Sequence, residues 1–290
     1  MSLRAGAVLA FLLVGGPGWA GETCPAFFAG GAAPVLRNPK LAARTVPLCF
    51  DAFAVLHSGT ARAPLYAAER LTRAGVEAAR RVDRVDSFHE EERLAPEARA
   101  ELSDYVRSGY DRGHMAPAGD MPTDRAQAQS FSLANIVPQD RTLNRFLWSS
   151  IEESVRRMAL RRGEIFVVTG PIFSGGSVEA LKGRVLVPGE IYKAVYDPAR
   201  GEAGAYVAAN RDDAEWRALS LDELRERSGI EVFPSAPPAV KARAMALPEP
   251  HAFSRGGPER RPAESWLDWL LAELGRALRK ALRDILRSIF

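Results

Sequence analysis

The sequence has few cysteines, few histidines and no large excess of charge of either sign. It contains two cysteines and four histidines among 290 residues. Two cysteines cannot build a cysteine-rich zinc site, and the sequence has no zinc-finger spacing, glycine-rich phosphate loop or G-x-S-x-G turn. The 39 basic and 36 acidic residues leave a net charge of +3, which permits a polyanionic partner but does not require one. These absences exclude several classes of site without naming a function.

An apolar content of 47% is enough for a substantial core, and the N-terminus carries a separate signal. Arg4 precedes an apolar run from Ala5 to Val14, which is followed by Gly15, Gly16 and Pro17 and by small residues at Gly18 and Ala20. About ten apolar residues are too few to cross a bilayer, which takes about 20. We therefore expect residues 1–20 to be a signal peptide and the mature protein to be secreted or periplasmic.

The two cysteines, Cys24 and Cys49, follow the expected cleavage point. Because an exported protein meets an oxidising compartment, we expect a disulfide between them. Such a bond would pin the mature N-terminus to the domain.

Short apolar segments predict an α+β domain with a mainly antiparallel sheet. Strand-forming residues dominate 45–59 and, across a turn, 65–72. Further stretches of this kind are 165–171, 184–196, 203–209 and 230–234. Residues 73–108 are rich in charge and predict a long surface excursion with a short helix. Strands and helices do not alternate as in βαβ folds, so we favour antiparallel pairing.

Apolar residues at helical spacing predict a helix from Thr142 to Gly163, with Thr142 as its cap and Gly163 as its stop. Ser220 begins a shorter predicted helix that ends at Ser228. We expect the compact domain to span residues 21–234.

The C-terminal part differs in composition from the domain. Residues 235–263 are rich in proline and glycine and predict an extended linker. Residues 264–290 place leucine and isoleucine on one helical face and arginine and lysine on the other. This pattern predicts a basic amphipathic helix that binds an anionic membrane surface or a partner's groove, or packs on its own domain.

The stretch SGYDRGHMAPAGD, from Ser108 to Asp120, concentrates acid, arginine, histidine and glycine around one turn. A histidine near an arginine is often structural, so this segment alone leaves a catalytic role open. A second polar cluster adds to it: Asn135, Asn144 at the start of the long predicted helix, and Glu152 two turns later. A lone polar residue at the edge of a buried helix face usually only caps or solvates that edge. The joint pattern with His114 favours a site.

The DRGH motif, followed after thirty residues by an asparagine in the L-N-x-x-x-W context, resembles the DNA/RNA non-specific endonuclease family. These are the ββα-metal (His-Me finger) nucleases, which include mitochondrial endonuclease G. The resemblance extends through N-I-x-P-Q at 135–139 and TGP at 169–171, and covers roughly residues 48–234. It implies the ββα-metal fold and a metal-dependent endonuclease that cuts DNA and RNA with little sequence specificity.

The resemblance also implies roles for four residues. Asn144 would be the single direct protein ligand of Mg²⁺ or Mn²⁺, with water and phosphate filling the other positions. Glu152 would hold a water bound to the metal, and Asn135 would hold the scaffold or His114 in position. His114 would be the general base that takes a proton from the attacking water, which requires a neutral imidazole.

Arginines complete the expected site. The resemblance places Arg84 against the scissile phosphate, although Arg81 competes for that role, and Arg112 is a further substrate-binding candidate. Asp111 and Arg112 are expected to brace the turn as an ion pair, and Gly113 to allow close backbone approach. Family members are often dimers, so a homodimer is a further expectation.

Two other readings remain open at this stage. One is a zinc metallohydrolase that uses His114 with Asp111 and Asp120, although the sequence offers no helical histidine pair to support it. The other is a catalytically silent module that binds nucleic acid or a membrane surface through its basic tail.

Overall fold

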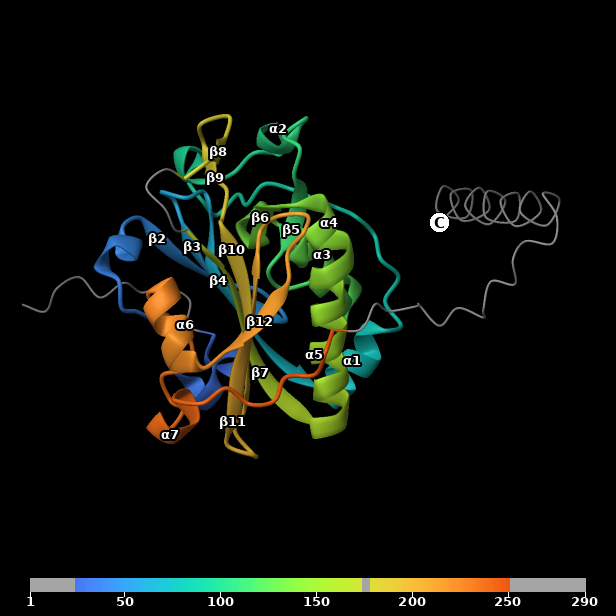
Figure 1. The fold of residues 1–290 in the computed structure, drawn as a ribbon. Coiled ribbons are helices and arrows are strands. Elements are labelled where there is room, and N and C mark those ends of the chain that lie inside the picture. The colour runs from blue at the N-terminus through green and yellow to red at the C-terminus, as the bar shows by residue number, and fades with distance from the viewer. Residues whose placement is uncertain (1–23, 174–177, 251–290) are drawn as a thin grey trace, which may run out of the picture. The chain divides into compact units, whose positions relative to one another are not determined.

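A computed structural model describes residues 24–173 and 178–250. The domain is built on a seven-stranded sheet in the order β12-β11-β10-β7-β4-β3-β2, in which all neighbours pair antiparallel (Figure 1). Its strands are β2 (Thr45–Cys49), β3 (Phe53–Ser58), β4 (Ala63–Thr72), β7 (Glu164–Ile172), β10 (Glu190–Asp197), β11 (Glu202–Ala209) and β12 (Trp216–Leu219). The expected α+β class with a mainly antiparallel sheet is confirmed.

Both faces of this sheet are buried. Helices α1 (Arg73–Ala79) and α5 (Ser149–Arg162) cover one face, and α6 (Leu221–Ser228) covers the other, as Figure 1 shows. The central strands β4, β7 and β10 are therefore almost continuously buried, because each strand packs apolar side chains in both directions. The sheet and the helices on its two faces form the core on which the smaller elements of the domain rest.

Smaller elements complete the domain. Strand β1 (Val35–Leu36) pairs with β13 (Ile230–Glu231), and β8 (Ala180–Leu181) pairs with β9 (Val185–Leu186). The remaining helices are α2 (Leu102–Tyr105), α3 (Asp124–Ser130), α4 (Arg141–Leu143) and α7 (Pro238–Lys241). Among the described residues, no helix is both long enough and apolar enough to cross a bilayer.

A two-stranded ribbon and the long helix after it form the part of the fold that carries the DRGH motif. Strand β5 (Asp111–His114) pairs antiparallel with β6 (Ile136–Gln139), and the chain continues directly into α4 and α5. Two strands followed by one helix are the ββα arrangement expected from the resemblance.

The start of that helix differs from the sequence prediction. Asp140, rather than Thr142, is the cap, since its side chain accepts hydrogen bonds from the backbone N–H groups of Thr142 and Leu143. A π-helical turn, Asn144–Trp148, separates α4 from α5. Gly163 ends the helix with a φ of 92°, a conformation that glycine adopts without strain, so the expected stop is confirmed.

Two sequence predictions of strands need correction, and one strand was missed. The stretch 45–59 is a hairpin of β2 and β3 that turns after Cys49, and 184–196 divides into β9 and β10. Strand β12 was not predicted, because its four residues include the exposed Arg217 and Ala218. The predicted helix with Ser220 as its cap is confirmed, with a capping box to Glu223.

The structure at the two ends of the domain can be compared with the predicted boundaries at residues 21 and 234. Cys24 and Cys49 form the expected disulfide. Residues 235–250, assigned from the sequence to a linker, pack on the domain: the Met245 N–H donates to the Ala203 carbonyl at 2.7 Å, and the Tyr206 hydroxyl donates to the Pro248 carbonyl at 2.8 Å. These residues therefore belong to the domain. The predicted signal peptide, the rest of the linker and the predicted helix 264–290 lie outside the described residues.

Candidate active site

His114 ends strand β5 and lies in an aromatic enclosure. The residue is 8% exposed, and the ring centroids of Phe88 and Phe131 lie 5.4 Å and 4.9 Å from that of its imidazole. Its Nε2 atom is buried without a hydrogen-bond partner. Burial, followed by the charge of the nearby Arg84 guanidinium, lowers the pKa of His114 to about 3. The imidazole is therefore neutral at physiological pH and has an unused nitrogen.

Two arginines lie beside this enclosure. The Arg112 guanidinium stacks over the Phe88 ring at 3.9 Å, and that of Arg84 lies 5.4 Å from the Phe131 ring centre. Arg84 also forms an ion pair with Asp86 at 2.7 Å. The charge of Arg84 acts on both His114 and Glu152, so the structure brings Arg84 into the site. Arg81, the sequence alternative, is exposed and makes no such contact.

Asn135 is fully buried and holds the backbone that follows His114. Its Oδ1 accepts from the Ala116 N–H at 2.9 Å, and its Nδ2 donates to the carbonyls of Ala116 and Ser130 at 2.8 Å and 2.9 Å. The Met115 N–H donates to the Asn135 carbonyl at 2.9 Å. Asn135 therefore supports the segment that positions His114 and does not bind its ring.

Gly113 allows strand β5 to lie close to β6. A Cβ atom at this position would stand 2.1 Å from Oε1 and 2.6 Å from Cβ of Gln139. Any larger residue would push the two strands apart beside His114, so the expected close approach is confirmed.

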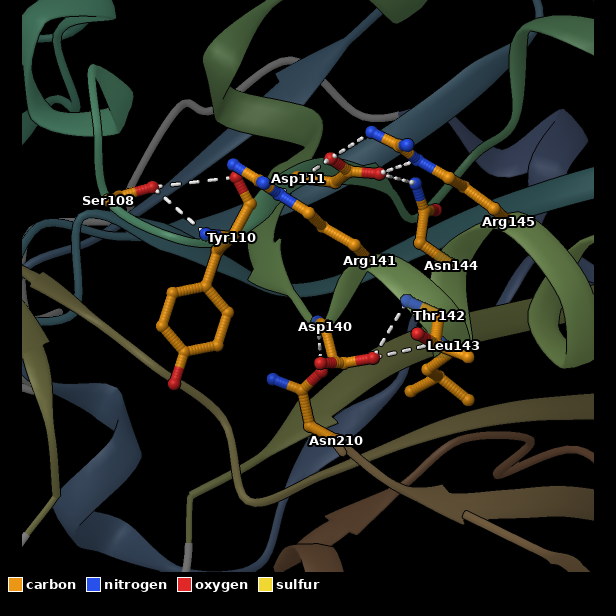
Figure 2. A network of polar contacts seen from close by, with 10 residues as sticks. All are labelled: Ser108, Tyr110, Asp111, Asp140, Arg141, Thr142, Leu143, Asn144, Arg145 and Asn210. Atoms are coloured by element: carbon orange, nitrogen blue, oxygen red, sulfur yellow. Dashed lines mark hydrogen bonds and ion pairs between the residues drawn. The ribbon is translucent and has the colours of Figure 1, made fainter. Parts of the chain in front are cut away.

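Asp111, at the other end of β5, contacts the helix that carries Asn144 (Figure 2). It accepts hydrogen bonds from Arg145 Nε at 2.8 Å, Arg145 Nη2 at 2.9 Å and Asn144 Nδ2 at 3.1 Å. The expected Asp111–Arg112 ion pair is therefore wrong, because Arg145 takes both carboxylate oxygens and Arg112 stacks on Phe88. The local sequence could not reveal a partner 34 residues away.

Glu152 lies one turn into α5 among other charged groups. Burial raises its pKa, while the charges of Lys193 and Arg156 oppose that rise. Arg156, one helical turn further on, forms ion pairs with Asp120 at 2.8 Å and with Glu153 at 2.9 Å. Sequence reasoning missed Arg156, although its spacing of four residues from Glu152 places both on one helix side.

A further charged pair, Glu69 and Lys193, lies in the core under this helix and was not predicted. Both side chains are fully buried, on β4 and β10, the two strands that flank β7. Lys193 Nζ donates to Thr169 Oγ1 at 2.7 Å, and neither carboxylate oxygen of Glu69 has a hydrogen-bond partner. Burial raises the pKa of Glu69 well above its usual range.

The residues around Asn144 fit a weakly held divalent cation. The Asn144 amide nitrogen is used by Asp111, and no hydrogen bond within the described residues uses its oxygen. Neutral amide oxygen is a ligand that Mg²⁺ accepts when water fills its other positions. In the described part of the chain, no group of three or more histidine, cysteine or acidic side chains is arranged to hold a metal. The fit is therefore to a hydrated ion.

Comparison with known proteins agrees with these observations. The profile of the DNA/RNA non-specific endonuclease family matches residues 35–239. Nuclease C1 of Cunninghamella echinulata var. echinulata is 34% identical over 203 residues, which are 63% of this chain and 81% of that protein. The mitochondrial nuclease of Saccharomyces cerevisiae is 30% identical over 206 residues, 61% of this chain and 62% of that protein. A nuclease of Nostoc sp. is 33% identical over 176 residues, 55% of this chain and 64% of that protein.

A solved structure supports the fold. A chain in the crystal structure of the EndoG/EndoGI complex superimposes with a TM-score of 0.60 at 23% identity, covering 71% of this chain and 92% of that chain. The ββα unit, the antiparallel sheet and the family match lead to one conclusion. This chain belongs to the DNA/RNA non-specific endonuclease family.

Proposed function

We propose that this chain is an exported endonuclease that hydrolyses phosphodiester bonds of DNA and RNA with the help of a divalent cation. The observation that carries the proposal is the buried and unpartnered Nε2 of His114, which lies on the same short strand as the Asp111 contact to Asn144. The nuclease relatives support the same class of reaction.

His114 would act as the general base. Because its imidazole is neutral, Nε2 can accept a proton from a water molecule as the water oxygen bonds to phosphorus. The bond from phosphorus to the 3′ oxygen then breaks, and that oxygen takes a proton from solvent. Burial lowers the pKa of His114, so the imidazole does not take up a proton from the solvent before the reaction.

Asn144 would hold Mg²⁺ or Mn²⁺ through its Oδ1 atom, and Glu152 would accept a hydrogen bond from a water on the ion. When bound, the cation supplies charge stabilisation for the phosphate and the departing oxygen. Asn135 would keep the His114 segment in place through its three side-chain hydrogen bonds.

Arg84 and Arg112 would bind the phosphate backbone. Both guanidiniums lie beside the His114 enclosure, and a guanidinium can donate to two phosphate oxygens at once. Contacts to phosphate carry no base information, so this arrangement supports cleavage with little sequence preference. Export rests on the N-terminal pattern at residues 1–20 and on the disulfide.

The zinc reading has less support. Asp120 is bound to Arg156 at 2.8 Å and Asp111 to Arg145 at 2.8 Å, so neither carboxylate is free to join His114 as a ligand.

The test is digestion of plasmid DNA and of RNA by the full chain in Mg²⁺, in Mn²⁺ and in EDTA. We expect cleavage of both substrates in either metal and none in EDTA. His114→Ala should remove cleavage while the far-UV spectrum is retained, and His89→Ala, which changes an exposed histidine, should leave it intact. Full activity of His114→Ala would overturn the mechanism. Binding without cleavage by the wild type in every metal would favour the silent module.

A further inference from the structure

The amide of Asn144 has two ends of nearly the same shape but opposite polarity. Only the oxygen can bind a cation, whereas the NH₂ group would repel one. A half-turn about the last side-chain bond exchanges the two ends. A site with Asn144 as its single protein ligand therefore needs something that selects one of the two orientations.

Asp111 is placed to make that selection. Asn144 Nδ2 donates to Asp111 Oδ2 at 3.1 Å, so the amide nitrogen points toward Asp111, as Figure 2 shows. No other hydrogen bond of this side chain is formed within the described residues, so its oxygen is left for a ligand. Asp111 therefore determines which end of the amide is free.

The charge of Asp111 makes the selection strict. Arg145 donates to both oxygens of Asp111, at 2.8 Å and 2.9 Å, and Arg141 lies 3.7 Å from Oδ1, so Asp111 faces two cationic side chains as a carboxylate. A carboxylate only accepts hydrogen bonds, so it can face the NH₂ end of Asn144 but not the oxygen end.

We propose that Asp111 is a positioning residue that fixes the rotation of the Asn144 amide, so that Oδ1 faces the cation. This inference rests on the proposed function. Direct binding of the cation by Asp111 fits less well, because Arg145 occupies both carboxylate oxygens at 2.8 Å and 2.9 Å. Asp111 would thus act through Asn144.

Asp111→Asn tests the inference with almost no change in shape. Arg145 can only donate, so it would bind the new amide oxygen and turn the new NH₂ group toward Asn144. The Asn144 amide would then rotate so that its oxygen accepts a hydrogen bond from the new NH₂ group, and its own NH₂ group would face the cation. We expect the Mn²⁺ dissociation constant of the full chain, measured by electron paramagnetic resonance without substrate, to rise about 10-fold to 100-fold.

The dependence of activity on Mn²⁺ separates positioning from other roles. Bound Mn²⁺ selects the correct amide rotation, so kcat of Asp111→Asn should return to within about threefold of wild type at saturating Mn²⁺. Arg145→Gln is the matched control, because it removes a neighbour of Asp111 but keeps the carboxylate, and its Mn²⁺ affinity should stay within about threefold of wild type.

The outcomes distinguish this inference from the proposed function. If Asn144→Ala binds Mn²⁺ as tightly as wild type, the proposed metal site fails and the inference fails with it. If Asn144→Ala loses affinity but Asp111→Asn does not, only the positioning role is overturned. A kcat that stays low at saturating Mn²⁺ in Asp111→Asn would also overturn positioning.

A measurement on the wild type covers the case in which Asp111→Asn fails to fold. In ¹⁵N-labelled protein, one Nδ2 proton of Asn144 should exchange slowly with water, since it is hydrogen-bonded to Asp111. Exchange of both protons at the rate of exposed asparagines would overturn the inference.

Discussion

His114 and Asn144 lie in surroundings of opposite character, although strand β5 contributes to both. His114 is 8% exposed, and its ring packs against two aromatic rings. Asn144 instead neighbours the charged pair of Asp111 and Arg145, and the Arg145 side chain is 62% exposed. A proton acceptor must stay neutral, and burial keeps it so, whereas a hydrated cation needs polar and accessible surroundings. Under the proposed function, the domain would thus separate its two chemical tasks by polarity.

The largest expected effect tests whether the surroundings of His114 and those of Asn144 act independently. His114→Ala should lower kcat by about 10²–10⁴, the usual contribution of a general base. Mn²⁺ affinity in the same variant should stay within about threefold of wild type, because the hydrogen bond of Asn144 within the described residues goes to Asp111 and the ring contacts of His114 go to Phe88 and Phe131. Steady-state kinetics and Mn²⁺ titration check both numbers, and a matching loss of Mn²⁺ affinity would break the comparison.

Burial of His114 should also make stability depend on pH, and His57, which is buried too and has a lowered pKa, should contribute in the same direction. The folded protein holds the pKa of His114 at about 3, whereas an unfolded histidine has a pKa of 6.5. Below pH 6.5 the unfolded chain therefore binds a proton that the folded chain does not, and stability falls as pH falls. The loss is at most about 1.4 kcal/mol per pH unit down to the folded value.

Urea unfolding from pH 7 to pH 4 measures this effect. His114→Gln should flatten the pH dependence relative to wild type, since glutamine does not titrate. His89→Gln, at an exposed position, is the control and should keep the wild-type slope. Identical slopes in wild type and His114→Gln would show that the histidine is not held neutral by burial.

The scaffold behind His114 should be costly to disturb. Asn135→Ala would leave the Ala116 N–H and the carbonyls of Ala116 and Ser130 without these hydrogen bonds in a buried place. We expect the free energy of unfolding to fall by about 3 kcal/mol. Asn38→Ala, which removes an exposed cap to Lys40, should lower it by about 1 kcal/mol. Equal losses would show that burial does not distinguish the two asparagines.

The smallest expected effect is on the exposed side of the site. Arg145→Gln removes the bidentate ion pair with Asp111, yet the arginine side chain is 62% exposed. The free energy of unfolding should fall by less than about 1 kcal/mol, and by less still in high salt. Thermal unfolding in low and high salt checks this. A loss above about 2 kcal/mol would mean that the contacts around Asp111 and Arg145 contribute as much to stability as those around His114.

Local patterns in the sequence predicted the parts of the fold that rest on periodicity or motif. The helix carrying Glu152 follows from the spacing of Ile151, Val155 and Met158, all buried against the sheet. His114 and Asn144 follow from the DRGH and L-N-x-x-x-W motifs. Their roles in catalysis stay predictions.

Features that depend on distant residues could not be predicted. Asp111 pairs with Arg145 rather than its neighbour Arg112, and Glu69 lies buried in a strand that reads as apolar. The hairpin of β2 and β3 is hidden because both strands are apolar and their turn is short. In each case the feature depends on a contact between two segments, and the residue pattern within either segment alone does not show which other segment it will contact.

Strand β5 sets a fixed spacing between the two ends of the site. Asp111 and His114 are three residues apart on one extended strand, a span of about 10 Å. Loops elsewhere can lengthen or shorten without changing that span, because β6 holds the strand in register along its length. Insertions outside the β5–β6 ribbon should therefore be compatible with the same chemistry, whereas a single-residue deletion within β5 would move one partner away from the other and turn its side chain to the opposite face.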